Sequence, residues 1–168
     1  WMTRNYREAY KIYATSGILF NHESALRQPS FVVKKIIRTA LDIQEGKADK
    51  LVLGNIDVRR DFGYAPSYVD AMWRIMQQDT PDDFMICSGF STSIREIVEI
   101  VFDKLSIPLS ALQTEQSLYR PAEIDENYGD PEKARRMLNW NYEFTMPQLI
   151  DQLITDELEV KEFLKLHS

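Results

Sequence analysis

The stretch Gly17-Ile18-Leu19-Phe20 is a short apolar run that follows Ser16, and the polar residues Asn21-His22-Glu23-Ser24 come directly after it. A short, continuous apolar run of this kind is typical of a strand that is buried on both faces in a parallel sheet. In open α/β sheets, ligands bind beyond the carboxyl ends of the strands. The polar residues after Phe20 are therefore the first candidates for a binding site.

Strand and helix patterns alternate along the rest of the chain. Capping residues and apolar periodicity predict helices over 31–45, from Ser67 as N-cap, from Ser91 with Ser93 and Glu96 in capping-box spacing, over 130–138, and from about Thr145. Short apolar or extended runs predict strands at 51–53 and 84–87 and an extended piece over 59–65. Residues 113–130 are polar and predict a loop with short extended parts. This alternation predicts an α/β fold.

The periodicity also predicts which side chains are buried. The expected buried positions are Phe31, Val32, Ile36, Ile37, Ala40 and Leu41 in the helix over 31–45, Ile94, Ile97, Val98, Val101 and Leu105 in the helix from Ser91, and Met146, Leu149, Ile150, Leu153 and Ile154 in the last helix. The helix from Ser67 carries Val69, Met72, Trp73 and Met76. We expect Trp73 and Trp140 to be core residues and not a stacking platform for a ligand.

The composition limits the classes of function. The 168 residues have 44% hydrophobic content, enough for a real core, and the formal net charge of -6 argues against nucleic acid as the main partner. Cys87 is the single cysteine and His22 and His167 are the only histidines, so we expect neither a disulfide framework nor a zinc or other metal site. Because no apolar run is long enough to span a bilayer and no secretory leader is recognisable, we expect a cytoplasmic protein without a membrane partner.

The chain begins at Trp1 in what reads as the middle of a helix. Tyr6, Ala9 and Tyr10 recur at helical spacing, and no capping residue precedes them. We expect that a preceding part of the protein is absent from this chain. The alternative is a short artificial extension in front of a natural start at Met2.

Three arginines, Arg27, Arg60 and Arg120, lie in loop-like stretches and not in the middle of a solvated helix face. The planar guanidinium offers a fork of donors that suits phosphate, which makes these residues candidates for binding an anionic ligand. For each arginine taken alone, a surface ion pair such as one between Arg60 and Asp61 is the simpler explanation.

Other polar residues are candidates with structural alternatives of their own. His22 beside Glu23 suggests acid–base chemistry, but a histidine that only shapes a loop would look the same. Asn21 at a strand end is able to bind a ligand or to terminate the strand by bonding its own backbone. The run Tyr119-Arg120-Pro121-Ala122-Glu123 combines charges with a rigid proline and is also typical of a plain turn.

Taken together, several stretches resemble the GDP-mannose 4,6-dehydratases. They are Asn21-His22-Glu23-Ser24, Phe31-Val32-x-x-Lys35-Ile36, Leu53-Gly54-Asn55-x-Asp57-x-x-Arg60-Asp61-Phe62-Gly63, Tyr68-Val69-Asp70-Ala71-Met72-Trp73, and Tyr119-Arg120-Pro121-Ala122-Glu123 followed by Gly129-Asp130-Pro131-x-Lys133-Ala134. The Arg-Asp-Phe and Tyr-Val-Asp pieces are generic to extended short-chain dehydrogenases that act on nucleotide sugars, whereas Asn-His-Glu-Ser and Arg-Pro-Ala-Glu are more specific. The resemblance runs from Tyr6 to about Asp156. It implies the C-terminal half of such an enzyme, with the last strands of a Rossmann-type sheet and a smaller mixed α/β substrate-binding domain.

The resemblance also implies a reaction and a set of binding residues. In that family a hydride passes from C4 of the mannosyl ring of GDP-mannose to NADP, water is eliminated across C5 and C6, and the hydride returns to C6. The product is GDP-4-keto-6-deoxymannose, on the way to GDP-fucose, and the intact enzyme is expected to be a homo-oligomer, either a dimer or a tetramer. The implied substrate-binding residues are Asn21, Val32, Lys35, Arg60, Arg120 and Glu123, with both arginines toward the diphosphate, and the implied cofactor-binding residues are His22 and Arg27.

The chain departs from the family pattern in several places. Ala25-Leu26-Arg27 stands where the family usually has Pro-Arg-Arg, in the loop that borders the cofactor and a tetramer contact, Val33 replaces a usual Thr, and 109–118 has no clear match. No Gly-x-x-Gly-x-x-Gly turn is present, and no tyrosine is followed four residues later by lysine. We therefore expect the dinucleotide-binding domain to be absent from this chain and the Tyr-x-x-x-Lys pair to lie just before Trp1. The choice between NAD and NADP depends mostly on residues outside the chain.

We thus expect residues 1–168 to be the substrate-binding portion of a lyase, with no catalytic residue of its own. Two alternatives stay open: a portion of a related nucleotide-sugar reductase or epimerase, and a non-catalytic module that binds sugar nucleotides. An open strand edge and exposed apolar surface would count against a free-standing module. The leading interpretation predicts that Arg60 and Arg120 converge on one cleft.

Overall fold

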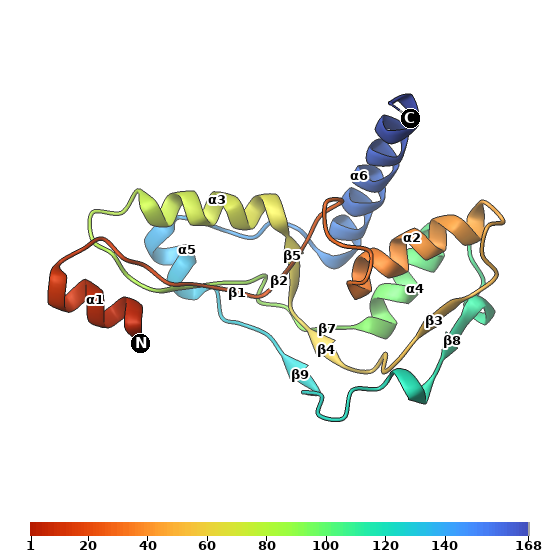
Figure 1. Ribbon diagram of the computed structural model, residues 1–168, viewed down its shortest axis with the longest axis horizontal. Coiled ribbons are helices and arrows are strands. Elements are labelled where there is room, and N and C mark those ends of the chain that lie inside the picture. Colours follow the sequence, from red (N-terminus) through yellow and green to blue (C-terminus); the bar gives the residue numbers. More distant parts are fainter. Residues whose placement is uncertain (168) are drawn as a thin grey trace.

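The computed structural model describes residues 1–167 and shows an α/β fold of short paired strands and helices (Figure 1). The helices are α1 (Met2–Tyr10), α2 (Val32–Gln44), α3 (Ala65–Met76), α4 (Ile94–Lys104), α5 (Glu132–Leu138) and α6 (Met146–Leu166), with short 3-10 turns at Leu109–Ala111 and Gln116–Leu118. The strands are β1 (Gly17–Leu19), β2 (Asn21–Glu23), β3 (Leu51–Leu53), β4 (Arg59–Arg60), β5 (Phe62–Tyr64), β6 (Phe84–Ile86), β7 (Thr92–Ser93), β8 (Leu112–Thr114) and β9 (Glu126–Asn127). The predicted fold class and the predicted alternation of elements are confirmed.

Most strand pairs are parallel and join segments that lie far apart in the sequence. β1 pairs with β6, β2 with β5, and β3 with β8, all in parallel. β4 is the middle strand of a three-stranded sheet, antiparallel to β7 and parallel to β9. Because parallel strands need long crossover connections, helices occupy the segments between the paired strands.

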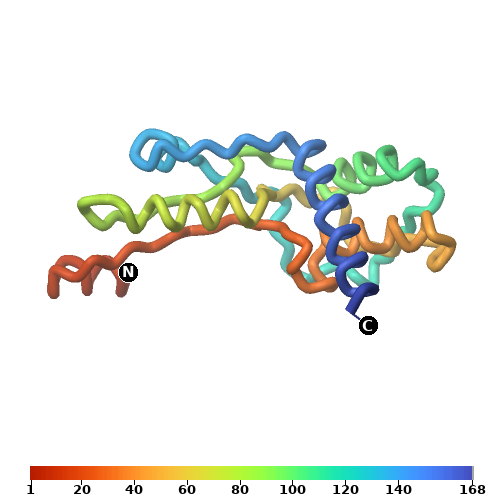
Figure 2. Tube along the Cα trace, turned by 90° about the horizontal axis from the view of Figure 1, so that it is seen from above, coloured from red at the N-terminus to blue at the C-terminus, as the bar shows by residue number. Residues whose placement is uncertain are grey.

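Two apolar clusters hold the fold together. The larger one packs α2, α4 and α6 against β3, and Ile36 and Leu51 are among its fully buried residues. The smaller one packs α3, β6 and α5 around Phe84 and Trp140. Figure 2 shows α3 between the N-terminal segment and the segment that carries α5. The prediction that Trp140 is a core residue is confirmed, since it is 2% exposed.

A buried carboxylate, that of Asp61, holds together the segments between the two clusters. Asp61 lies between β4 and β5 and is 0% exposed. It accepts hydrogen bonds from the backbone N–H and the hydroxyl of Ser88, both at 2.8 Å, and from the N–H of Gly89 at 2.9 Å. Its backbone N–H donates to the carbonyl of Asn127 at 3.0 Å. The chain after β4, β6 and β9 is therefore fixed at one point.

The helix ends largely follow the sequence signals. The Ser93 hydroxyl accepts from the Glu96 N–H at 3.1 Å, and the Glu96 carboxylate accepts from the Ser93 N–H at 2.7 Å, so the predicted capping box at α4 is confirmed. α6 begins after Thr145 as predicted. α5 begins at Glu132, where the carboxylate of Asp130 accepts from the Glu132 N–H at 2.9 Å.

The predictions for α3 are wrong in two respects. The helix begins at Ala65 and not after a Ser67 cap, because β5 leads straight into it and Pro66 fits the first turn. Trp73 is 62% exposed and not a core residue. The exposed side chains of α3 also include Val69, Met72 and Met76, whereas Tyr68, Ala71 and Ile75 are buried. α3 has apolar residues on two faces, and only one of them packs against β6 and α5.

β1 and the start of α2 are also less buried than predicted. Ile18 is 53% exposed, because β6 is the only strand that pairs with β1 among residues 1–167. Phe31 is 44% exposed, because it precedes the first residue of α2 and does not turn with the helix toward the core. The predicted core positions that are only partly buried, among them Val32, Leu105, Met146 and Ile154, pack on the rim of the larger cluster.

Replacing Asp61 with Asn is expected to lower the free energy of unfolding by about 3 kcal/mol, because the amide brings donors to a site that already presents donors. The measurement is urea-induced unfolding followed by circular dichroism. Asp57→Asn is the matched control, since Asp57 is exposed and pairs with Arg95 at the surface, and its expected effect is within about 0.5 kcal/mol. Equal effects of the two substitutions would contradict the role assigned to Asp61.

Candidate functional site

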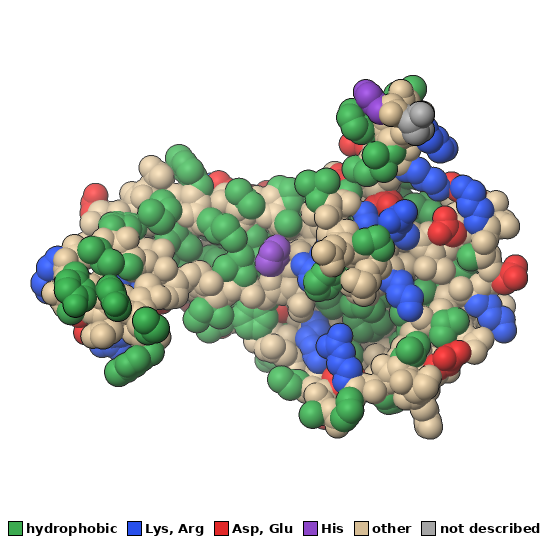
Figure 3. All heavy atoms as spheres, in the orientation of Figure 1, with side chains coloured by type: hydrophobic (Ala, Val, Ile, Leu, Met, Phe, Trp, Pro, Cys, Tyr) green, Lys and Arg blue, Asp and Glu red, His purple; other side chains and the backbone are tan. Residues whose placement is uncertain are grey.

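A cleft of about 540 Å³ lies where the end of β2, the start of α2, β4 and residues 118–123 meet. Small-molecule sites typically enclose roughly 300–1,000 Å³. Five of the six predicted substrate-binding residues line the cleft, namely Asn21, Val32, Arg60, Arg120 and Glu123. The other lining residues are Glu23, Arg27, Ser30, Phe31, Gly54, Asn55, Val58, Phe62, Ile94 and Leu118. Figure 3 shows Lys and Arg side chains gathered on this face over α2 and β4.

Arg60 and Arg120 reach the cleft from two separate segments, β4 and the chain after Gln116–Leu118. The Arg60 guanidinium donates to the Arg59 carbonyl at 2.7 Å and lies 3.9 Å from the Glu123 carboxylate. Arg120 is exposed. The prediction that the two arginines converge on one cleft is confirmed, and their role in binding a ligand stays a prediction.

The first turn of α2 borders the same cleft. Ser30, Phe31 and Val32 line it, and the N-cap residue Phe31 offers no side-chain hydrogen bond to the N–H groups of the first turn. Free backbone N–H groups and the positive end of the helix dipole favour an anion at this position. Val32, the first helical residue, therefore lies where the backbone attracts negative charge.

Asn21 and Lys35 both donate to backbone carbonyls, but only Asn21 lines the cleft. The Asn21 amide donates to the carbonyl of Asp61 at 2.9 Å. The Lys35 ammonium donates to the carbonyl of Val52 at 2.7 Å, within β3. Lys35 is the one predicted substrate-binding residue that the structure does not bring to the cleft lining, because its side chain extends from α2 toward β3.

The two predicted cofactor-binding residues are placed differently from each other. His22 does not line the cleft: its Nδ1 lies 2.8 Å from the carbonyl of Phe20, and its ring centroid lies 5.3 Å from that of Tyr68. Arg27 does line the cleft, with its guanidinium 3.9 Å above the ring of Phe31. Arg27 also donates to the carbonyl of His22 at 2.5 Å. The structure thus groups Arg27 with the predicted substrate-binding residues.

Glu23 is the buried acid of the cleft, and it is 3% exposed. Its carboxylate lies 3.2 Å from Nε of Arg27. Burial raises the pKa of Glu23 to about 7, and the positive charge of Arg27 opposes part of that increase. Glu23 and Arg27 therefore form a coupled pair on the wall of the cleft.

Phe31 and Leu118 were not predicted as site residues, and Glu23 was predicted only as a polar residue after the first strand and a neighbour of His22, without a partner in Arg27. For Glu23 the available signal is its four-residue spacing to Arg27, but these residues are not in a helix, so the spacing alone does not bring them together. Phe31 was assigned to the buried face of a helix. Leu118 lies in a stretch without a clear match to the family, and its contact with Gly54 is visible only in the fold.

Two negative findings apply to residues 1–167. No group of three or more His, Cys, Asp or Glu side chains is arranged to hold a metal ion. In the same part of the chain, no helix combines the length and apolar character needed to cross a membrane.

Residues 1–153 match the family profile described as GDP-mannose 4,6 dehydratase. GDP-mannose 4,6 dehydratase 2 of Caenorhabditis elegans is 38% identical, over 96% of this chain and 47% of that protein. GDP-mannose 4,6 dehydratase 1 of Arabidopsis thaliana is 39% identical, over 95% of this chain and 45% of that protein. The chain spans about half the length of the relatives it matches.

Solved structures share the fold. RMD from Pseudomonas aeruginosa, complexed with NADPH, superposes with a TM-score of 0.84 at 23% identity, over 95% of this chain and 53% of that one. A dTDP-glucose 4,6-dehydratase from Bacillus anthracis, in complex with NAD, superposes with a TM-score of 0.83 at 15% identity, over 96% of this chain and 50% of that one. At these identities the likeness shows the fold alone, and that fold agrees with the predicted α/β class.

Replacing Glu23 with Gln is expected to change how stability depends on pH. The pKa of Glu23 is raised from 4.5 to about 7 on folding, so the folded state binds the extra proton between these values. The neutral Glu23 carboxyl therefore stabilises the folded state fully below pH 4.5, and this stabilisation is lost as the pH rises through about 7. Glutamine does not titrate, so Glu23→Gln should not lose stability for this reason over the same range.

The measurement is the difference between the urea midpoints of the native protein and Glu23→Gln from about pH 4 to about pH 8. Glu99→Gln, at an exposed position of α4, is the control and should give a flatter difference. A midpoint difference for Glu23→Gln that does not vary with pH would show that the buried carboxyl does not titrate in this range.

Proposed function

Because the chain belongs to the GDP-mannose 4,6-dehydratase family, we propose that it is the substrate-binding portion of a nucleotide-sugar 4,6-dehydratase and that its cleft binds GDP-mannose. The observation that carries the proposal is the convergence of Arg60, Arg120 and the uncapped start of α2 on one cleft. Charge-assisted hydrogen bonds from arginine to phosphate are roughly twice as strong as neutral ones. A diphosphate in this cleft would meet the guanidinium groups of Arg60 and Arg120 and free backbone N–H donors, and Arg27 also lines the cleft.

The remaining lining residues suit the other parts of a nucleotide sugar. Glu123 lies beside Arg60 and offers carboxylate oxygens to ribose or sugar hydroxyls. Phe31 and Phe62 give the cleft an apolar wall, against which a flat base is able to pack. Lys35 would add a donor only if its ammonium left the carbonyl of Val52.

The proposed reaction of the intact enzyme converts GDP-mannose to GDP-4-keto-6-deoxymannose, with NADP as the hydride carrier. The described residues do not fit a dinucleotide site of their own. His22 is engaged with the carbonyl of Phe20, and Arg27 lines the same cleft as Arg60 and Arg120. The glycines are dispersed and form no phosphate-binding turn. We therefore assign no catalytic residue to this chain and propose that the cofactor is held mainly by residues outside it.

We propose that the dinucleotide-binding half packs against the exposed apolar surface of α1, β1 and α3. Tyr10 is 68% exposed, Ile18 53% and Trp73 62%. Figure 3 shows hydrophobic side chains gathered over these elements. Exposed apolar area of this extent is typical of an interaction surface. It favours a portion of a larger enzyme over a free-standing binding module.

The other parts of the proposal rest on the family resemblance. They are a homo-oligomeric parent enzyme, a cytoplasmic location, and a place in the formation of GDP-fucose. Epimerases and dehydratases share this fold, so the fold does not discriminate between a dehydratase and a related reductase or epimerase. Product analysis on the intact parent makes that distinction.

The native chain is expected to bind GDP, and Arg60→Ala and Arg120→Ala are each expected to weaken binding by at least about tenfold, since each removes a charge-assisted bond to phosphate. The measurement is isothermal titration calorimetry. Binding of guanosine, which lacks the diphosphate, should change little in both variants.

Arg95→Ala is the matched control, because Arg95 is a partly exposed arginine that pairs with Asp57 away from the cleft lining. It should leave the affinity for GDP unchanged. A native chain that does not bind GDP, or arginine variants that bind it as tightly as the native chain, would contradict the proposed function.

The proposed contact of α1, β1 and α3 with a dinucleotide-binding half is testable with a relative that contains such a half. When this chain is co-expressed with the part of the Caenorhabditis elegans relative that it does not match, we expect a complex that forms through α3. Trp73→Lys should weaken the complex by at least about tenfold, because it places a charge in an apolar contact, and should leave GDP binding unchanged. The measurement is co-purification followed by sedimentation.

Leu158→Lys is the control for this experiment, since Leu158 is 46% exposed on α6, away from the proposed surface. Loss of the complex in Leu158→Lys but not in Trp73→Lys would place the contact elsewhere.

A further inference from the structure

A buried ion pair lies behind the loop 24–31 that forms one wall of the cleft. Lys34 of α2 is 7% exposed and Glu157 of α6 is 6% exposed, and the two side chains are in direct contact. The second carboxylate oxygen of Glu157 lies 3.4 Å from Nε of Arg38. These residues line a separate cavity of about 420 Å³ between α2 and α6, and neither Lys34 nor Glu157 lines the cleft.

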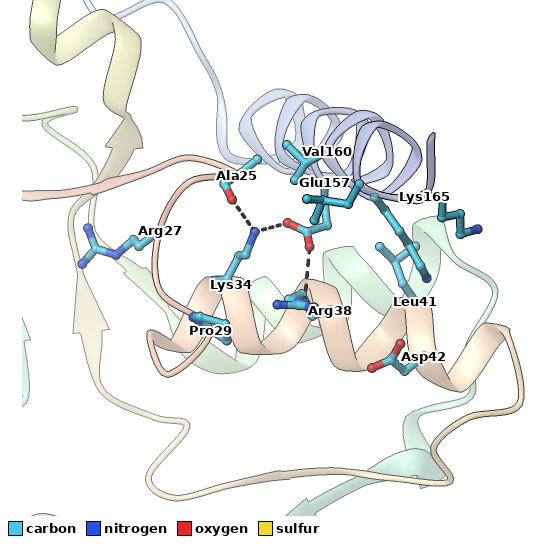
Figure 4. Close-up of a pocket in the computed structure, with 12 residues that line it drawn as sticks. Ala25, Arg27, Pro29, Lys34, Arg38, Leu41, Asp42, Glu157, Val160 and Lys165 are labelled. Carbon is cyan, nitrogen blue, oxygen red and sulfur yellow. Dashed lines mark hydrogen bonds and ion pairs between the residues drawn. The ribbon is translucent and has the colours of Figure 1, made fainter. Parts of the chain in front are cut away.

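Lys34 also holds the loop itself. Its ammonium donates to the carbonyl of Ala25 at 2.6 Å. Figure 4 shows Ala25, Lys34, Glu157 and Arg38 joined by a continuous line of polar contacts, and the side chain of Arg27 extends from the opposite side of the loop. α6 is thereby connected through one lysine to the backbone two residues before Arg27.

The contacts within the loop transmit this anchoring to Arg27. The N–H of Arg27 donates to the carbonyl of Ser24 at 3.1 Å, which closes the turn that contains Ala25. The Arg27 guanidinium donates to the carbonyl of His22 and forms an ion pair with the carboxylate of Glu23. Fixing the carbonyl of Ala25 therefore fixes the point from which the Arg27 side chain enters the cleft.

Stability alone does not account for this ion pair. Replacing a buried ion pair by apolar residues of similar volume is often neutral or stabilising, because desolvation offsets the attraction between the charges. Two other cations that line the cavity also have carboxylate partners. Arg38 pairs with Glu157, and the Lys161 ammonium lies 2.5 Å from the carboxylate of Glu45. The contact with Glu157 holds the Lys34 ammonium in the position from which it donates to the carbonyl of Ala25.

We propose that Lys34 and Glu157 are positioning residues of the cleft, which hold the loop 24–31 so that Arg27 faces the diphosphate of the bound nucleotide. This inference rests on the proposed function of the cleft. Lys34 and Glu157 act from behind the loop, without touching the ligand.

The experiment compares GDP affinity and urea stability in the native chain, Lys34→Met/Glu157→Leu, Arg27→Ala and the triple variant. The apolar pair is expected to keep the urea midpoint near the native value. It should still weaken GDP binding by about tenfold, because methionine cannot donate to the carbonyl of Ala25. Arg27→Ala should cause a similar loss, and the triple variant should bind no more weakly than either, since both changes remove the same contribution.

Lys104→Met/Asp151→Leu is the matched control. Its ion pair also joins α6 to a neighbouring helix, at 2.6 Å, but has no contact with the loop. GDP affinity should be native in this variant.

Three results would overturn the inference. If Lys34→Met/Glu157→Leu binds GDP like the native chain, the pair is structural only. If the losses from that variant and from Arg27→Ala add in full, the pair does not act through Arg27. If the native chain itself does not bind GDP, the proposed function fails and the inference fails with it, and that result is distinguishable from failure of the variants alone.

Discussion

The buried carboxylate of Asp61 is the contact on which the arrangement of the cleft depends. The carboxylate accepts hydrogen bonds from Ser88 and Gly89. The backbone carbonyl of Asp61 accepts from the Asn21 amide, and its backbone N–H donates to the carbonyl of Asn127. Four segments that are distant in sequence therefore meet at one residue. Arg60 is its direct neighbour in the chain, so the direction in which Arg60 enters the cleft follows from how Asp61 is held.

The cleft is a basic site in an acidic chain, with a formal net charge of -6. Its positive character is local, because Arg27, Arg60 and Arg120 are brought together from three separate segments, and the start of α2 adds its dipole. Glu23 and Glu123 compensate part of this charge without filling the cleft. Buried polar contacts at Asp61 and Lys34 hold the segments that carry Arg60 and Arg27, so these two arginines are set in place before any ligand arrives. Preorganisation of this kind lowers the entropic cost of binding.

The sequence predicted those features that local signals encode. The capping box at Ser93, the start of α6 after Thr145 and the apolar faces of α2 and α4 all follow from residues within one or two helical turns. The convergence of Arg60 and Arg120 was predicted from a family resemblance and not from spacing. Burial in α3 was not predictable in the same way, since two of its faces are apolar and the sequence does not state which one meets β6 and α5. Lys35 and His22 lie outside the cleft lining, where a backbone carbonyl engages each of them, and their predicted binding roles stay predictions.

By itself, the sequence determined the α/β class, the order of the elements and the set of arginines that line the cleft. The tertiary structure alone decided that Trp73 is exposed, that Glu23 is buried against Arg27, and that Glu157 is tied through Lys34 to the cleft loop. Local propensity and periodicity act over a few residues, whereas these contacts join residues of separate elements, and in the case of Lys34 and Glu157 of distant ones. Such contacts form only where packing brings the elements together. A buried charge is unfavourable unless an opposite charge or a hydrogen-bonding group lies beside it, so each buried charge is paired within the fold.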